Sequence, residues 1–410
     1  MTRRMQRGAL FVLTLLLTAG MPGDLVPAEA EDPPAEPPDW PTGAAAYDNM
    51  ADLAGIGYRR IAKGTDVLDT QANQDGRDWI AAELESYGYE VERQPFTTAE
   101  CDNCENIVVT INGTLDDQWI VVGAHHDAIC YSPPPLIGTT YPGCTSSGAY
   151  DDGTGSGALL ELARTFAAWN ITPEHTWKLG WWDYEEWQGS GSAEGGGNVN
   201  VTYVNLDMFA LNWPVQIPGT MQAACNEEYW TLYMFTSPVS DWSYYENEGL
   251  DVTDDMRSNA VAFQEDLREV NTNLSHPEEW VRVIDDTAGN SDHYNFIMNG
   301  HTATWLRGQH QYIHQEGDTC EQTPKHSQTD SIFTINRLAG GQSNVEAGLQ
   351  TGLDIIATLA WWDRNVTMEE TDETEMESSG VSFGIVLGSV ALLLVPVAFI
   401  GGTRFARLQR

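Results

Sequence analysis

Basic side chains are scarce in this chain, where 20 Lys and Arg stand against 60 Asp and Glu and give a formal net charge of −40 at pH 7. Proteins that bind nucleic acid need a basic face to contact the phosphates. The charge balance therefore excludes nucleic acid as a partner class. An acid excess of this size favours solubility and suggests a salty habitat.

Cysteine is sparse as well, at six residues. They are Cys101, Cys104, Cys130, Cys144, Cys225 and Cys320. An even number in an exported chain favours disulfide bonds. A zinc site of paired Cys-x-x-Cys motifs is disfavoured, because only one such motif is present. If Cys130 pairs with Cys144, the remaining disulfides would be Cys101–Cys104 and Cys225–Cys320. Other pairings of the six cysteines are equally compatible with the sequence.

Long apolar runs occur only near the two ends. Residues 9–19 follow three arginines and precede the small residues 28–30, which is the layout of a secretory signal peptide. A twin-arginine signal remains the alternative, because Arg3 and Arg4 are adjacent. Asn-x-Ser/Thr sequons agree with an exported glycoprotein.

Residues 381–400 are uncharged and long enough to cross a bilayer core of about 30 Å. Arginines follow this run, so the positive-inside rule places the C-terminus in the cytoplasm. We therefore expect a protein that is exported to the cell surface and anchored in the membrane by one C-terminal helix.

Composition divides the chain into six parts. They are a signal peptide (1–30), a Pro-rich acidic linker (31–45), a folded domain (46–363), an acidic stalk (364–380), a transmembrane helix (381–401) and a basic cytoplasmic tail (402–410). The central part is long enough for one large domain with a sizeable core.

Apolar patterns in the central part alternate between strand-like and helix-like. Strands are expected at 90–96, 107–111, 119–122, 177–182 and 201–206, and helices at 75–88 and 155–169. Asn112-Gly113 indicates a hairpin turn. In the second helix, Glu161 and Arg164 are expected to point outward. The alternation predicts an α/β fold with a mixed, mainly parallel twisted sheet flanked by helices on both faces.

Polar residues follow several of the predicted strands directly. His125 comes at the end of the strand at 119–122, and Asp127 is placed to accept a hydrogen bond from its ring. Asp207 follows the strand at 201–206 in the same way. Alone, each of these patterns is more typical of a surface turn, whereas together they indicate a shared site.

Two acidic pairs lie between these residues. Asp151 and Asp152 precede the second helix, where either could cap its N-terminus or bind metal. Glu185 and Glu186 follow two tryptophans, and an ionised pair in such surroundings is costly unless a metal or water contacts it. One glutamate could then bind metal while the other acts as a base.

A late histidine completes the set. His326 begins a His-x-x-x-Asp pattern that ends at Asp330, and His314 begins the same pattern earlier. His310 and His314 have the spacing of a helical metal pair, but no neighbouring Glu completes that motif. We prefer His326 and keep His314 as its rival.

The ordered series resembles metallopeptidase family 28. It comprises Gly-Ala-His-x-Asp, Ala-x-Asp-Asp-Gly-Thr-Gly, Glu-Glu-x-x-Gly-Ser, Asn-Leu-Asp-Met, Ser-Asp-His at 291–293 and the late His-x-x-x-Asp. The match runs from about Tyr58 to Trp361 and implies the zinc exopeptidase fold. Tyr150 and Asp152, beside Asp151, depart from the usual family residues.

The resemblance also implies roles for single residues. Two Zn²⁺ ions are expected, with His125 and Asp207 on one and Glu186 and His326 on the other. Asp151 would bridge the ions. The resemblance further implies that Glu185 would be the general base and that Asp127 would orient His125.

Peptides are the expected substrates, and an aminopeptidase is the preferred activity. A carboxypeptidase is the nearest alternative, with Arg307 available to bind a substrate carboxylate. A glutaminyl cyclase usually needs one zinc, and a non-catalytic receptor would usually lose ligands or the base. All five ligands and the base are present here.

Overall fold

The computed structural model describes residues 39–61, 70–99, 101–130, 145–187, 199–209, 232–276, 281–285, 291–308, 312–315 and 319–364. The predicted signal peptide, transmembrane helix and basic tail lie outside these residues. The helix α1 begins at Gly43, so the last residues of the predicted linker at 31–45 belong to the folded domain.

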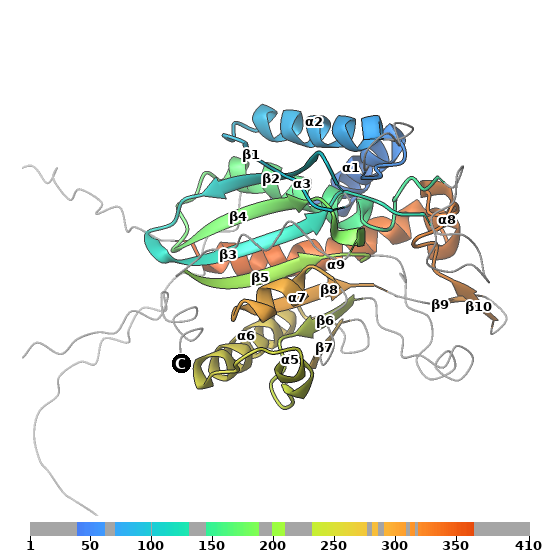
Figure 1. The fold of residues 1–410 in the computed structure, drawn as a ribbon. Helices are drawn as coiled ribbons and strands as arrows, with labels where there is room; N and C mark the ends of the chain where they lie inside the picture. The colour runs from blue at the N-terminus through green and yellow to red at the C-terminus, as the bar shows by residue number, and fades with distance from the viewer. Residues whose placement is uncertain are drawn as a thin grey trace, which may run out of the picture. The chain divides into compact units, whose positions relative to one another are not determined.

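A mixed eight-stranded sheet forms the centre of the domain (Figure 1). Its strands are β1 (Glu92–Phe96), β2 (Cys104–Ile111), β3 (Leu115–His125), β4 (His175–Trp182), β5 (Asn200–Leu206), β6 (Leu232–Thr236), β7 (Val281–Asp285) and β8 (Thr302–Arg307), in the order β1-β2-β4-β3-β5-β8-β6-β7. Strands β4, β3, β5 and β8 run parallel to their neighbours in that order, as do β6 and β7. Strands β9 (Tyr312–Gln315) and β10 (Thr319–Gln322) form a separate antiparallel pair.

Helices cover both faces of the sheet. They are α1 (Gly43–Ile56), α2 (Thr70–Ser86), α3 (Gly153–Trp169), α5 (Ser243–Asn247), α6 (Asp254–Asn273), α7 (His293–Met298), α8 (Ile332–Ala339) and α9 (Gln342–Trp362), with a 3₁₀ turn η1 at Glu185–Trp187. The larger hydrophobic core lies where α1, α3 and α9 pack on one face, and a smaller core lies under α5 and α7 on the other. The predicted mixed α/β fold with helices on both faces is confirmed.

The predicted hairpin at Asn112-Gly113 is wrong. Strand β2 pairs with β1 and β4, whereas β3 pairs with β4 and β5, so the two consecutive strands are not neighbours. The chain instead passes close to the start of β4, where a Cβ on Gly113 would overlap the backbone of His175. Glycine is needed here for close approach rather than for a hairpin turn.

The outward direction expected for Glu161 is also wrong. Its side chain is fully buried, and it accepts hydrogen bonds from Thr42 N (2.8 Å) and from Arg164 Nε (2.7 Å) and Nη2 (2.9 Å). A buried carboxylate is tolerated when it is paired in this way. Glu161 therefore ties the start of α1 to α3.

The structure does not support the transmembrane helix in the predicted fold class. Among the residues that the structure describes, no helix is long and apolar enough to cross a membrane.

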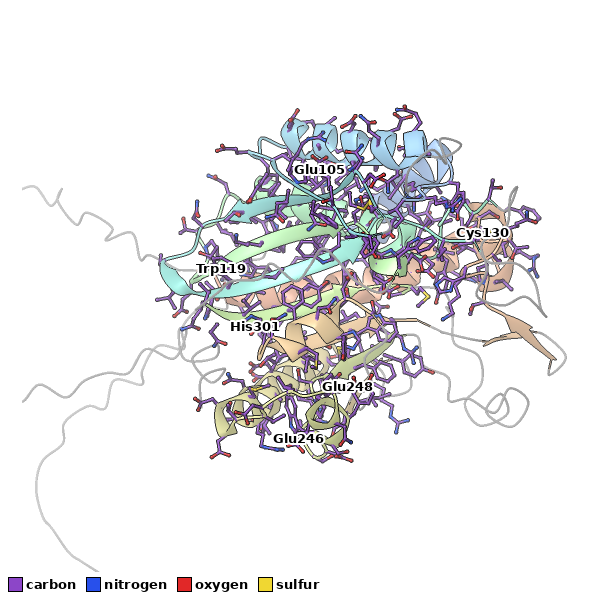
Figure 2. All side chains as sticks on the ribbon, viewed as in Figure 1. Glu105, Trp119, Cys130, Glu246, Glu248 and His301 are labelled. Carbon is purple, nitrogen blue, oxygen red and sulfur yellow. A yellow bond between two sulfur atoms is a disulfide. The ribbon has the colours of Figure 1, made fainter. Side chains whose placement is uncertain are left out.

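One predicted disulfide joins Cys101 and Cys104 at the start of β2. Cys130, which Figure 2 labels in the segment after β3, is also disulfide-bonded. The predicted partners Cys144 and Cys225 lie outside the described residues. Their pairings and the glycosylation sites stay predictions.

Replacing Glu161 by alanine should lower the free energy of unfolding by about 2 kcal/mol, because Thr42 N–H and the Arg164 guanidinium lose a buried acceptor. Urea denaturation measures the change. The matched control is Glu85→Ala on the exposed side of α2, which should change stability by less than about 0.5 kcal/mol. Equal effects would contradict the structural role of Glu161.

Candidate metal centre

The carboxyl ends of three neighbouring parallel strands form the site. Strand β3 ends at His125, β4 leads into Glu185 and Glu186, and β5 leads into Asp207. Parallel strands present their carboxyl ends at one edge of a sheet, which is where sites in open α/β sheets form. This topology brings together residues that lie far apart in the sequence.

The Asp127 carboxylate holds two parts of the site. His125 Nδ1 lies 3.1 Å from Asp127 O and 3.4 Å from Asp127 Oδ1, so Nε2 faces the other acidic residues. The Asp127 carboxylate also accepts hydrogen bonds from the backbone N–H groups of Glu185 and Glu186, both at 3.3 Å. Asp127 therefore orients the predicted ligand His125 and the turn that carries the two glutamates.

Asp151 lies between the two histidines. Its Oδ1 is 3.2 Å from His125 Nε2, and its Oδ2 is 3.0 Å from His326 Nε2. Burial opposes ionisation of this carboxyl, but the adjacent His125 and His326 rings hold its pKa well below the usual range. Each carboxylate oxygen thus faces a different half of the site.

His326 and Glu186 make up one half of the site. His326 Nε2 lies 2.8 Å from Glu186 Oε2. Burial and the nearby Asp151 charge raise the pKa of Glu186 to about 7. Of His314, in β9, the structure describes only the backbone, so the geometry favours His326 without testing its rival.

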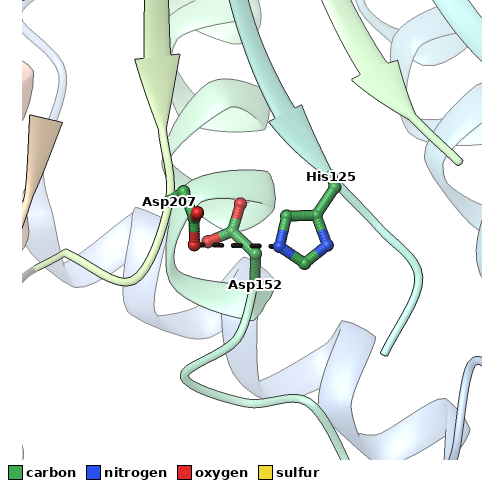
Figure 3. A group of neighbouring side chains, drawn as sticks. All are labelled: His125, Asp152 and Asp207. Carbon is green, nitrogen blue, oxygen red and sulfur yellow. Dashed lines mark ion pairs between the residues drawn. The ribbon is translucent and has the colours of Figure 1, made fainter. Parts of the chain in front are cut away.

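His125 and Asp207 make up the other half (Figure 3). Asp207 Oδ1 lies 3.7 Å from His125 Nε2. Asp152 also points here, but its Oδ1 accepts hydrogen bonds from Gly155 N (2.8 Å) and Met208 N (3.2 Å). Asp152 therefore caps α3 and supports the loop after Asp207. The helix cap was one of the two roles that the sequence allowed for this residue.

Glu185 stands beside the cluster rather than inside it. Its Oε2 is 3.9 Å from His125 Nε2, and its side chain is 15% exposed, against 3% for Glu186. Burial raises the pKa of Glu185 well above its usual value, and the charges of Asp292 and Asp207 raise it further, while His125 opposes the rise. A carboxyl with these properties can hold a proton and remain accessible.

The sequence did not indicate a role for two supporting residues. Arg59 is fully buried and donates to the backbone oxygens of Leu53, His126, Ser147 and Gly148 at 2.6–3.2 Å. It fixes the loop before Asp151 against the end of β3. No sequence pattern could have found Arg59, because its partners are all backbone atoms.

Asp330 is the second such residue. Its Oδ1 accepts from Tyr150 N (2.7 Å) and its Oδ2 from Asp151 N (3.2 Å). It joins the loop that carries His326 to the loop that carries Asp151. The His-x-x-x-Asp pattern in the sequence includes Asp330, but it did not indicate that Asp330 joins these two loops.

The donor atoms fit a zinc centre. Two ligands of one tetrahedral zinc at about 2.0 Å lie about 3.3 Å apart, close to the separations found between these nitrogens and oxygens. His125 Nε2 and Asp207 Oδ1 are buried, yet they make no hydrogen bond within the described part of the chain. Buried polar atoms are normally paired, so their arrangement agrees with a bound cation.

The model of Peptidase family M28 matches residues 106–338. The chain belongs to this family. The resemblance seen in the motifs is thereby confirmed. The matched region contains every residue predicted for the metal centre, together with Glu185 and Asp127.

Two curated proteins resemble parts of the chain. Leupeptin-inactivating enzyme 1 of Streptomyces exfoliatus is 22% identical over 45% of this chain and 38% of its own length. Probable glutamate carboxypeptidase AMP1 of Arabidopsis thaliana is 33% identical over 25% of this chain and 14% of its own length. The chain thus spans less than half of either protein.

Solved structures share the fold. A glutaminyl cyclase of Tannerella forsythia is 17% identical, with a TM-score of 0.53 over 79% of this chain and 99% of its own. A Zn-dependent exopeptidase of Parabacteroides distasonis is 19% identical, with a TM-score of 0.50 over 78% of this chain and 99% of its own. At these identities the similarity shows the fold alone.

Zinc should stabilise the protein, and a chelator should reverse the effect. Zinc at about a thousand times its dissociation constant adds about 4 kcal/mol to the free energy of unfolding. Thermal unfolding with EDTA and then with zinc measures the gain. Asp151→Asn should lose most of it, whereas the exposed control Asp251→Asn should keep it. An equal gain in both variants would place the metal elsewhere.

Proposed function

We propose that this protein is a zinc exopeptidase that hydrolyses peptides with a pair of zinc ions, and that its main activity is that of an aminopeptidase. One observation carries the proposal: the two oxygens of Asp151 face different histidines, at 3.2 Å and 3.0 Å, and each histidine has its own acidic neighbour. One carboxylate between two such His–acid pairs is the ligand arrangement that a two-metal site requires.

His125 and Asp207 would hold one ion, Glu186 and His326 the other, and Asp151 would bridge them. When bound, a zinc pair supplies Lewis acidity, which lowers the pKa of water and polarises a carbonyl group. This chain's own contribution is to hold the donor atoms rigidly, because Asp127, Asp330 and Arg59 fix the segments that carry them.

Glu185 would act as the general base. Its carboxylate would accept a proton from the attacking water at Oε2 and then donate that proton to the nitrogen of the leaving group. The raised pKa of Glu185, which burial and neighbouring carboxylates cause, suits a group that must take a proton from water and later release it.

A carboxypeptidase is the second candidate, and one observation favours it. Arg307 ends β8 beside the strand that leads to Asp207, and its guanidinium lies 4.3 Å from the Phe235 ring centroid. Lys325 precedes His326; burial lowers the pKa of Lys325, while the charges of Asp151 and Asp207 oppose that shift. Two cations beside one centre are notable in so acidic a chain and could bind a substrate carboxylate.

We also propose that the protein works outside the cytoplasm. The Cys101–Cys104 disulfide supports this, because disulfides persist mainly in oxidising compartments.

One peptide in free, N-terminally blocked and C-terminally blocked forms distinguishes the candidates. The zinc-loaded protein should shorten only peptides with a free N-terminus, as mass spectrometry would show. Shortening only at free C-termini would replace the aminopeptidase by a carboxypeptidase. In that case Arg307→Met should raise KM for the peptide, whereas Arg257→Met should not, because the Arg257 side chain on α6 is 40% exposed. Pyroglutamate formation without shortening would indicate a cyclase.

Replacing Glu185 by glutamine should lower kcat by about 10²–10⁴-fold, because the base is lost, while the zinc content stays unchanged. Glu186→Gln is the matched comparison, and it should lose zinc. Steady-state kinetics and metal analysis of both variants measure the two effects. Full turnover by Glu185→Gln would remove Glu185 from the mechanism.

A further inference from the structure

A tryptophan side chain lies across the two strands next to the centre. Gly123 of β3 and Gly180 of β4 are register partners. A Cβ on either glycine would overlap the Trp182 side chain, and one on Gly123 would also lie 2.6 Å from Tyr203 Oη. The paired glycines therefore leave the space that the Trp182 ring and the Tyr203 hydroxyl occupy.

Four consecutive hydrogen bonds lead from this ring to Asp207. Trp182 Nε1 donates to Tyr203 Oη (2.8 Å), and Tyr203 Oη donates to Asn205 Oδ1 (2.9 Å). Asn205 Nδ2 donates to Ser291 Oγ (2.7 Å), and Ser291 Oγ donates to Asp207 Oδ2 (2.6 Å). All five side chains are buried. We call this set the Trp182–Asp207 relay.

The chemistry of the first group fixes the direction of the whole relay. An indole N–H can only donate, so Tyr203 must accept from Trp182 and give its own proton to Asn205. Asn205 then has to accept with its oxygen and donate with its nitrogen, which leaves the Ser291 proton for Asp207. Every bond therefore donates toward the carboxylate, and such chains strengthen one another.

The relay occupies one oxygen of Asp207 and leaves the other for the centre. Oδ2 is held by Ser291, whereas Oδ1 faces His125 Nε2 at 3.7 Å and makes no hydrogen bond to any described residue. Rotation of the carboxylate would break the last bond of the relay. The side chain is thus fixed in the orientation in which one oxygen alone can bind a cation.

We propose that Tyr203, Asn205 and Ser291 are positioning residues that set the metal affinity of the His125–Asp207 half of the centre. The inference rests on the proposed two-metal site and adds a distant determinant of its affinity. Groups that hydrogen-bond to metal ligands change affinity by about 10–100-fold when they are removed. The Tyr203 hydroxyl bonds to Trp182 and Asn205 rather than to Asp207, so its effect must pass through the relay.

Tyr203→Phe is the decisive variant. The ring should stay in place, because it stacks on Phe296 with centroids 3.8 Å apart and planes 12° apart. The matched control is Tyr89→Phe, which removes a hydroxyl that donates to Ala163 O (2.8 Å) in α3. Tyr203→Phe removes two hydrogen bonds and Tyr89→Phe removes one, but only Tyr203 belongs to the relay.

Competition with a chromophoric chelator measures the affinity of both zinc ions without any turnover. Tyr203→Phe should lower the affinity for one ion by about 10-fold and leave the affinity for the other unchanged. It should also alter the visible spectrum of the cobalt-substituted protein. Ser291→Ala should lower the affinity for the same ion at least as much. Ser291→Thr keeps the hydroxyl and should therefore retain the affinity of the parent protein. Tyr89→Phe should bind zinc like the parent.

Unchanged affinity in Tyr203→Phe and Ser291→Ala would overturn the inference while the two-metal site stands. Failure of the parent protein to bind two ions would instead overturn the proposed function itself. If Tyr203→Phe does not fold, the comparison of Ser291→Ala with Ser291→Thr decides: equal affinities in these two variants would also contradict the relay.

Discussion

Carboxylates that are buried together repel one another unless a cation lies between them. Asp151, Glu186 and Asp207 meet at one edge of the sheet, all less than a tenth exposed, and each has a carboxylate oxygen within 3.7 Å of an imidazole nitrogen. Burial, together with the nearby charge of Asp151, raises the pKa of Glu186 to about 7. A divalent cation relieves the repulsion more effectively than a proton could, because it binds several oxygens at once. The rest of the domain can be understood as the scaffold that keeps these groups close together.

The scaffold works by tying together segments that are distant in sequence. Arg59 links the end of β3 to the loop before Asp151, and Asp330 links that loop to the segment that carries His326. The Trp182–Asp207 relay joins β4, β5 and the start of α7 in the same way. These contacts use backbone atoms or buried hydroxyl groups, so each position is fixed by directional bonds as well as by packing. The protein's own contacts therefore position the groups that surround the centre.

The sequence predicted the strands that carry ligands, because a short apolar run followed at once by His or Asp marks both the strand and its functional end. It also predicted that His125, Asp151, Glu186, Asp207 and His326 would act together, since they occur in a family order. It failed where tertiary context overrides local pattern. Asn112-Gly113 has the composition of a hairpin turn, but Gly113 instead lets the chain pass close to the backbone of His175. Glu161 has the helical spacing of an exposed residue, but its side chain is buried and pairs with Arg164. Arg59 and Tyr203 gave no signal, because their partners become neighbours only after folding.

The central claim is that two metal ions lie on either side of Asp151. A crystal structure of the zinc-loaded protein, with anomalous diffraction data collected on both sides of the zinc absorption edge, tests it most directly. The account predicts two anomalous peaks about 3.5–4 Å apart, one beside His125 and Asp207 and one beside Glu186 and His326. A single peak, or two peaks that do not share Asp151, would contradict it.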